Sequence, residues 1–192
     1  LASRVRVRTG DEFEWLAEAF NNMASRLGRQ ISALEAMSGI DRMILSGTKF
    51  EEVSEDVVGH LVNLTRCNAA AVIACDTDAP TKGKMISLHD GEVFHERIDL
   101  PIDAGHSWCQ PRQVAIAEVP EADAPYKSRF EAFEQNYVVL IPVILNDDLK
   151  GVLLIGFKSQ FDMSQNSLQR CVDLAGRFAV ALSSVAREET LY

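Results

Sequence analysis

The chain has 192 residues, of which 47% are hydrophobic and 24% are charged, and its formal net charge is −9. This composition suits one ordinary hydrophobic core with additional helix and is small for two full domains. The acidic balance, with no basic stripe, excludes the usual nucleic-acid-binding surface, so no nucleic-acid partner is expected. The longest apolar run, residues 137–145, is too short to span a bilayer.

A long helix is predicted near the start of the chain, within residues 10–46. Thr9 and Glu12 form a capping-box pattern just before an apolar repeat. The repeat is narrow, which is typical of a helix that pairs with another helix, often a second copy of itself. A helix packed on its own domain is the alternative interpretation. The residues of this seam are Phe13, Leu16, Phe20, Met23 and Leu27.

The middle of the chain begins with a second helix, predicted from Phe50 to about Thr65, and then a strand over residues 69–75. Residues 84–100 are predicted to form a hairpin, because Asp90-Gly91 is a strong two-residue turn signal between two β-prone runs. Such a turn places His89 opposite Glu92 and His95 opposite Ile86. The two imidazoles are then out of register, which argues against a shared metal ion.

Further elements follow a loop at residues 101–113. We expect a strand over 114–119, a helical stretch around 126–134 and a second hairpin over 137–158. Helices at both ends of the chain and short turns between the strands predict an α+β fold. It should hold a mostly antiparallel sheet of about six strands, with helices packed on one face.

The last helix is predicted to start near Asp162 or Ser164, with Asp162 and Gln165 as its capping pair. Its apolar residues repeat at steps of three and four, so its early turns should cover the sheet. Its final turns are too narrow to be buried in one domain and are typical of a coiled coil. Leu182 and Val185 would therefore extend the helical seam near the C-terminus.

Three parts of the sequence resemble known signalling modules. Residues 4–27, RVRVRTGDEFEWLAEAFNNMASRL, resemble the second half of a HAMP module, with its Asp11-Glu12 pair and its Ala19-Phe20-Asn21 pattern. Residues 31–185 resemble a GAF sensory domain, above all in ILSGTKFEEVSEDVVGHLVNLTRCNAAAVIACD and YVVLIPVILNDDLKGVLLIGF. The tail, AREETLY, resembles the linker into a diguanylate cyclase (GGDEF) domain.

These resemblances imply a domain order: residues 1–30 as the C-terminal half of HAMP, 31–185 as the GAF domain, and 186–192 as the start of an output linker. The chain has no initial methionine, and we expect a piece from the middle of a larger protein. The implied whole is a homodimeric receptor paired through its terminal helices. An upstream membrane segment would anchor it to the inner membrane, with this part in the cytoplasm. The implied output is a diguanylate cyclase, a cyclic-di-GMP phosphodiesterase, or both.

Other interpretations remain open at this stage. The GAF module is alternatively a dimerisation and spacing element that binds no ligand. The output is alternatively a histidine kinase or a chemoreceptor signalling hairpin. The chain holds no G-x-S-x-G, P-loop, H-E-x-x-H or GGDEF motif, so the fragment itself is expected to be non-catalytic.

GAF domains bind small molecules between the sheet and the loops that cover it, here residues 101–113 and 120–136. Aromatic and polar side chains in these loops suit such a pocket, although they suit a lid on the core equally well. No cofactor is assigned and the small ligand is unknown. The candidate ligand-binding residues are His106, Trp108, Cys109, Tyr126 and Phe130.

Cys109 is the one cysteine of four that lies outside an expected helix or strand. Some GAF domains attach a bilin through a cysteine that His typically follows, but Gln110 follows here. A nucleophilic role for Cys109 is a further alternative, and it requires an exposed thiol of low pKa. The remaining cysteines, Cys67, Cys75 and Cys171, are predicted to be small buried hydrophobes.

Overall fold

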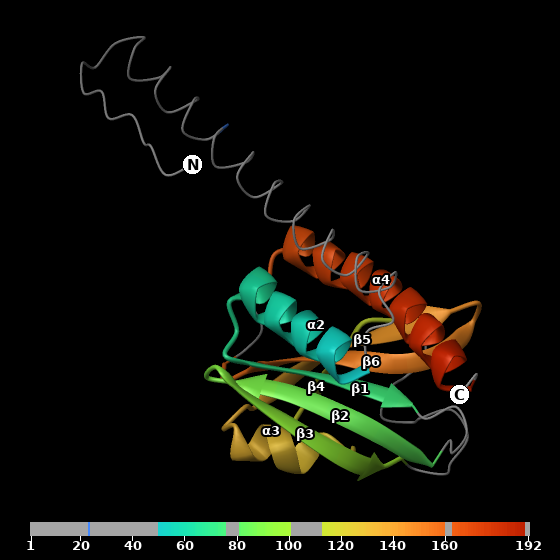
Figure 1. Cartoon of the computed structure of the whole chain (residues 1–192). Helices are drawn as coiled ribbons and strands as arrows, with labels where there is room; N and C mark the ends of the chain where they lie inside the picture. The colour runs from blue at the N-terminus through green and yellow to red at the C-terminus, as the bar shows by residue number, and fades with distance from the viewer. Residues whose placement is uncertain (1–22, 24–49, 76–80, 101–112, 160–162, 191–192) are drawn as a thin grey trace. The chain divides into compact units, whose positions relative to one another are not determined.

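The structure, a computed structural model, describes residue 23 and residues 50–75, 81–100, 113–159 and 163–190. The chain divides into two compact units at Gly39, and the elements below belong to the second, Ile40–Tyr192. Figure 1 shows them in chain order: α2 (Phe50–Thr65), β1 (Ala69–Cys75), β2 (Lys82–His89), β3 (Glu92–Asp99), β4 (Ala115–Glu118), α3 (Lys127–Ala132), β5 (Tyr137–Leu145), β6 (Asp148–Phe157) and α4 (Gln165–Thr190). The elements predicted within these ranges are confirmed.

The strands form one six-stranded sheet in the order β3-β2-β1-β6-β5-β4, with every neighbouring pair antiparallel. The predicted register of the first hairpin is confirmed, since His89 pairs with Glu92 and Ile86 with His95. At the centre of the sheet, β1 pairs with β6, a strand far away in the sequence. Ala69 lies opposite Gly156 at one end of this pair of strands. Both hairpins thus join at their inner strands.

Both hairpins turn on two residues with positive φ. Asp90 and Gly91 have φ values of 47° and 87°, and Asn146 and Asp147 have 52° and 66°. Two consecutive left-handed residues match the right-handed twist of the flanking strands, which is why Asp, Asn and Gly are favoured there.

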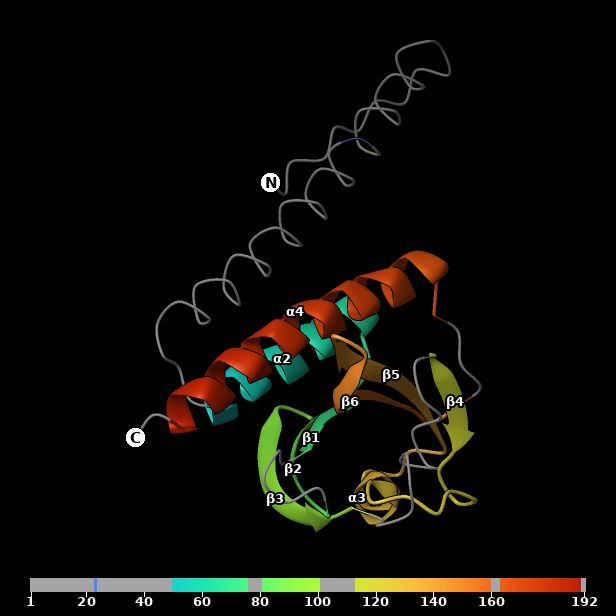
Figure 2. The ribbon, with the colours of Figure 1, turned by 90° about the vertical axis from the view of Figure 1, so that its right-hand side faces the viewer.

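Helices α2 and α4 lie side by side on one face of the sheet (Figure 2), as the predicted fold class requires. The apolar side of α2 is buried against alternate residues of the strands. Helix α4 contributes Cys171, Ala175 and Phe178 to the same core, so this part of its predicted seam belongs to the domain interior. The main core therefore lies between the two long helices and the sheet.

The start of α4 differs in detail from the predicted capping pair. The Ser167 backbone N–H donates to the Ser164 hydroxyl oxygen at 3.2 Å. Ser164 thus acts as the N-cap, because its side chain satisfies one of the free N–H groups of the first turn. Asp162 lies outside the described residues. Among the helices that the structure describes, none has the length and apolar character needed to cross a membrane.

The opposite face of the sheet carries the short helix α3 and a second core (Figure 2). Tyr126 and Phe130 are its largest members, and they pack with Met85, Leu140 and Leu154 from the strands. The sheet is therefore covered on both faces, by two long helices on one and by the α3 segment on the other.

Candidate functional site

The structure describes two of the predicted ligand-binding residues. Tyr126 and Phe130 are 1% and 0% exposed and meet edge to face, with ring centroids 5.9 Å apart. They lie between α3 and the sheet, where the resemblance places a ligand. His106, Trp108 and Cys109 lie outside the described residues.

Four small residues lie on the α3 side of the sheet, beside the larger side chains of the second core, and we call them the α3-side floor: Ala69, Ala71, Ser87 and Gly156. Ala69 lies between His89 of β2 and Gly156 of β6 in one row across the sheet. Ser87 and Ala71 are paired in the next row of the same face. A floor of small residues lets the groups above approach the backbone closely.

Two aromatic rings of the α3 segment cover the α3-side floor. Phe133 stacks on His89, with ring centroids 4.4 Å apart and planes 11° from parallel. Phe130 lies against Gly156, where an added Cβ would stand 2.9 Å from the Phe130 ring. The two rings are 6.1 Å apart. They therefore bracket Ala69, the residue between His89 and Gly156.

Arg129 fixes the outer side of α3 to the edge of the sheet. Its Nε donates to Glu96 Oε2 on β3 at 2.9 Å, and its second nitrogen bonds the other carboxylate oxygen. The guanidinium carbon also lies 4.9 Å from the centroid of the Phe94 ring and 5.6 Å from that of Phe133. The Arg129 charge is thus matched by Glu96 and stacked against aromatic rings.

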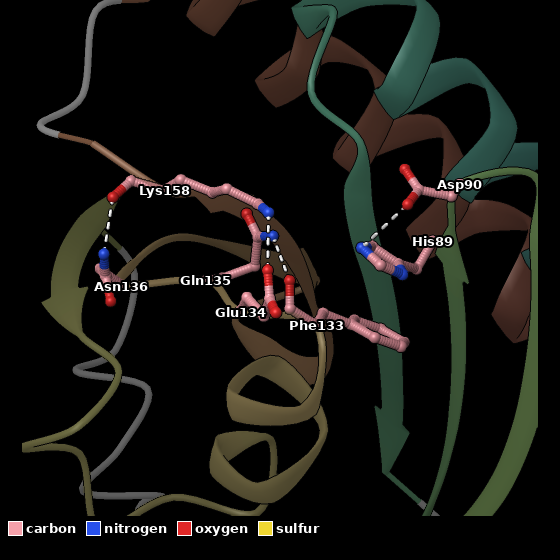
Figure 3. A network of polar contacts seen from close by, with 7 residues as sticks. All are labelled: His89, Asp90, Phe133, Glu134, Gln135, Asn136 and Lys158. Carbon is pink, nitrogen blue, oxygen red and sulfur yellow. Dashed lines mark hydrogen bonds and ion pairs between the residues drawn. The ribbon is translucent and has the colours of Figure 1, made fainter.

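The C-terminal turn of α3 is tied to the end of β6 by polar contacts, which Figure 3 draws. Lys158 Nζ lies 3.0 Å from Glu134 Oε2, and the Asn136 side-chain amide donates to the Lys158 carbonyl at 2.7 Å. Gln135 Nε2 donates to the Phe133 carbonyl at 2.6 Å. Glu134, at the centre of this turn, has a left-handed φ of 55°.

Three buried polar atoms on this side of the sheet have no hydrogen-bond partner among the residues that the structure describes: Ser87 Oγ, Gln135 Oε1 and His89 Nε2. Ser87 and Gln135 are 0% and 2% exposed. His89 Nε2 is 3.6 Å from Asp90 Oδ2 (Figure 3), which is an ion pair only if the imidazole is protonated and is too long for a hydrogen bond. Buried polar atoms are normally paired, so these three unpaired ones mark the α3 side of the sheet as a candidate binding region.

A concave region lies on the helix side of the sheet, where α2 faces β2 and β3. It is a groove of about 250 Å³, and its walls include Phe50, Lys84, His95 and Arg97. Lys84 Nζ is 3.1 Å from a Glu51 carboxylate oxygen. Burial raises the pKa of Glu51, but hydrogen bonds from its backbone and from Lys84, with the Lys84 charge, outweigh burial and lower it. The groove is open and its lysine is already paired.

Burial suppresses the reactivity of the three described cysteines, Cys67, Cys75 and Cys171. Burial raises the pKa of Cys171 to about 12 and that of Cys75 to about 11. Burial also raises the pKa of Cys67, against the opposing hydrogen bond with Thr65. A thiolate is the reactive form, so these residues are poor nucleophiles at neutral pH. Cys171 is buried as predicted, whereas Cys67 and Cys75 are only half-buried.

The described residues contain no group of three or more His, Cys, Asp or Glu that would hold a metal ion.

The predicted signalling seam is described at three positions. Met23 is helical and 67% exposed, and Leu182 is half-buried against the helix-side core. Val185 lies within α4, whose backbone alone is described there. Phe13, Leu16, Phe20 and Leu27 lie outside the described residues. Val180, which was not part of the predicted seam, is 47% exposed on α4.

Comparison with known proteins identifies the fold. No protein-family model and no curated protein matches the sequence. One similar structure is the phycoerythrobilin-bound GAF domain from a cyanobacterial phytochrome. The alignment covers 82% of this chain and 97% of that domain, at 14% sequence identity and a TM-score of 0.61. Another is the GAF domain of an Acinetobacter phosphoenolpyruvate-protein phosphotransferase. That alignment covers 83% of this chain and 98% of the other domain, at 12% sequence identity and a TM-score of 0.58.

A third match is the GAF domain of a two-component sensor histidine kinase from Bacillus halodurans. The alignment covers 70% of this chain and 97% of that domain, at 18% sequence identity and a TM-score of 0.50. At these identities the likeness establishes a GAF-like fold and carries no ligand or output from one protein to another. The predicted fold is confirmed, and the chain is structurally similar to domains of a phytochrome and a histidine kinase.

Sequence reasoning did not single out Ser87, Arg129 or Gln135. Strand alternation offers one signal, because it puts the hydroxyl of Ser87 on the same buried face as Met85. No comparable signal exists for Gln135, whose position follows from the left-handed turn at Glu134. Arg129 is an ordinary basic residue on a short helix until the fold brings Glu96 beside it.

Proposed function

We propose that this chain is the regulatory part of a bacterial-type signal-transduction protein, in which a GAF domain senses a small ligand or relays an upstream HAMP signal. The proposal rests on the GAF-like fold. It is supported by unpaired polar atoms beneath α3 on one face of the sheet and the long helix α4 on the other. A site on one face and a helix on the other suit the conversion of binding into a change of helix position.

The output is proposed from the sequence resemblance. A diguanylate cyclase downstream of α4 would be regulated by how two copies of α4 pair, and the fragment itself would carry no catalysis. The upstream HAMP half would lead to a segment that anchors the receptor in the inner membrane. The protein would then act as a homodimer joined through its terminal helices.

Helix pairing is tested by native mass spectrometry of the 192-residue chain. We expect a dimer that Val180→Glu weakens about tenfold or more, because a charge would enter an apolar contact between helices. Gln169→Glu is the matched control, since it adds a charge on the exposed side of the same helix near its N-terminus. A monomeric wild type, or a dimer equally stable in both variants, contradicts pairing through α4.

The relay is tested in the full-length protein. Polar replacement of Phe20 or Leu27 should uncouple output activity from the upstream signal, because both lie in the predicted seam. Regulation that survives both replacements would count against a HAMP relay. Two activity assays of the full-length protein distinguish the possible outputs. Cyclic-di-GMP formation would indicate a cyclase, and ATP-dependent autophosphorylation would indicate a kinase.

One observation favours a second function. Phe130 fills the space over Gly156 and Tyr126 is fully buried beside it, so the α3 side is already well packed near these residues. That packing suits a GAF domain that serves only as a dimerisation and spacing element. Native mass spectra that show a dimer without any retained small molecule, even from gently lysed cells, would favour this function.

A further inference from the structure

We propose that the groove between α2 and the β2–β3 hairpin binds a small carboxylate that carries an apolar group. We call it the helix-side groove, since it lies on the face of the sheet that α2 covers, opposite α3. Its volume of about 250 Å³ suits a small molecule rather than a large cofactor. The site goes beyond the regulatory function proposed above, which does not require it.

Arg97 is the cation of the helix-side groove that has no acidic partner among the described residues. It lies directly opposite Lys84 on the neighbouring strand, so two cations share one row on one face of the sheet. Like charges so placed destabilise a sheet. Lys84 is compensated, because its Nζ lies 3.1 Å from Glu51 Oε1. An anion beside Arg97 would compensate the second charge of this row.

The other carboxylates that border the groove are already engaged. Glu55 Oε1 on α2 lies 2.9 Å from His95 Nε2 on β3. The Glu96 side chain alternates to the opposite face of the sheet, where it accepts hydrogen bonds from Arg129. The described residues therefore direct no carboxylate at Arg97, and its guanidinium can bind a ligand.

The floor of the helix-side groove is apolar, which favours an organic anion over an inorganic one. Phe50 and Ile86 line it and are 6% and 2% exposed. Lys84 Nζ lies 5.2 Å from the centroid of the Phe50 ring, so positive charge and apolar surface are adjacent. A guanidinium binds a carboxylate through two parallel hydrogen bonds. A ligand that joins a carboxylate to an apolar group would use both parts of the groove.

The test titrates the ¹⁵N-labelled 192-residue chain with three probes at constant ionic strength while NMR spectra report binding. Benzoate is an apolar ring with a carboxylate, benzamide has the same ring without the charge, and inorganic phosphate has the charge without the ring. We expect benzoate to bind about tenfold more tightly than benzamide, as a charge-assisted contact implies. Phosphate should also bind more weakly than benzoate. Shifted resonances should include residues 84–86 and 95–97.

Variants locate the partner of the carboxylate. Arg97→Gln should weaken benzoate binding about tenfold, whereas Lys158→Gln, which removes the same charge on the α3 side of the sheet, should leave it unchanged. Glu51→Gln should strengthen benzoate binding about threefold, because it frees Lys84 for the ligand. Glu52→Gln is its matched control, since Glu52 is exposed on the same turn of α2 and does not line the groove. A gain of binding in Glu51→Gln cannot result from unfolding.

Several results would overturn the inference. These are equal binding of benzoate and benzamide, phosphate binding as tight as that of benzoate, no binding of any probe, resonance shifts confined to the α3 side, or benzoate binding that survives Arg97→Gln. The proposed regulatory function is tested separately, by the α4-dependent dimer and by signal relay in the full-length protein. A chain that ignores benzoate but still pairs through α4 would keep that function and lose only the carboxylate site.

Discussion

Arg129 on α3 and Glu96 on the edge strand β3 form a two-pronged ion pair that is only partly open to solvent. The two side chains are 22% and 32% exposed, and Arg129 Nε lies 2.9 Å from Glu96 Oε2. The guanidinium also rests on the rings of Phe94 and Phe133. This contact joins the cover of the candidate site to the outermost strand of the sheet.

Arg129→Ala should lower the free energy of unfolding by roughly 1–2 kcal/mol, through loss of the ion pair and of the stacking on aromatic rings. Arg129→Lys should recover only part of this, because lysine cannot make the two-pronged contact. Urea denaturation of the single variants, of Glu96→Gln and of the double variant gives the pairwise energy, which we expect to be about 1 kcal/mol.

Lys82→Ala is the control for Arg129→Ala. Lys82 pairs with Asp99 on the same hairpin, but these side chains are 62% and 86% exposed. Exposed pairs contribute little, so the change should stay within about 0.5 kcal/mol. Equal losses in the two variants would mean that Arg129 is an ordinary surface residue.

Much of the fold follows from local sequence. The helix from Phe50, both hairpins and the strand after Asn68 were predictable, because their apolar periods and turn residues act over a few positions. The pairing of His95 with Ile86 followed from the Asp90-Gly91 turn alone. Local rules thus fix the elements and their register within each hairpin.

The parts that the sequence left open depend on long-range packing. No local pattern predicts that β1 pairs with β6, with Ala69 opposite Gly156. The order of the strands in the sheet is therefore known only from the structure. The same holds for the α3 segment, which crosses to the face opposite α2 and α4. The unpaired state of Ser87 and Gln135 depends on both, so these polar atoms were not predictable. The place of Tyr126 and Phe130 in the cover of the sheet was predicted, and their role in ligand binding stays a prediction.

Gly156→Ala tests how closely the α3 segment approaches the sheet. An added Cβ would stand 2.8 Å from Gln135 Cγ and 2.9 Å from the Phe130 ring, so side chains of the cover must shift. We expect a loss of about 1–3 kcal/mol in the free energy of unfolding, measured by urea denaturation.

Gly59→Ala should change the free energy of unfolding in the opposite direction. Gly59 lies within α2, and a Cβ there meets no atom of the described residues within 4 Å. Alanine is the better helix former, so the free energy of unfolding should rise by about 0.5–1 kcal/mol. If Gly156→Ala left the free energy of unfolding unchanged while Gly59→Ala raised it, the side chains over Gly156 would be shown to shift at little cost.

The buried thiol of Cys171 predicts a dependence of stability on alkaline pH. Burial raises its pKa from 9.0 to about 12 in the folded chain. Between these values the unfolded chain gives up the proton and the folded chain keeps it, so stability falls as pH rises above 9. Cys171→Ala removes this contribution. Urea unfolding at pH 8, 9.5 and 10.5 should therefore show a smaller decline in the variant than in the wild type, and equal declines would contradict a protected thiol.

Glu134→Gly should relieve backbone strain in the turn that ends α3. Glu134 has a φ of 55°, a left-handed conformation that costs a non-glycine residue about 1–2 kcal/mol. Glycine adopts it freely but loses more entropy on folding, about 0.5–1 kcal/mol, and the ion pair with Lys158 is exposed and weak. The free energy of unfolding should rise by about 0.5 kcal/mol. Glu131→Gly, inside the same helix, should lower it by about as much. Urea denaturation that gives both variants the same sign would mean that the Glu134–Lys158 contact, rather than the backbone, determines the stability of this turn.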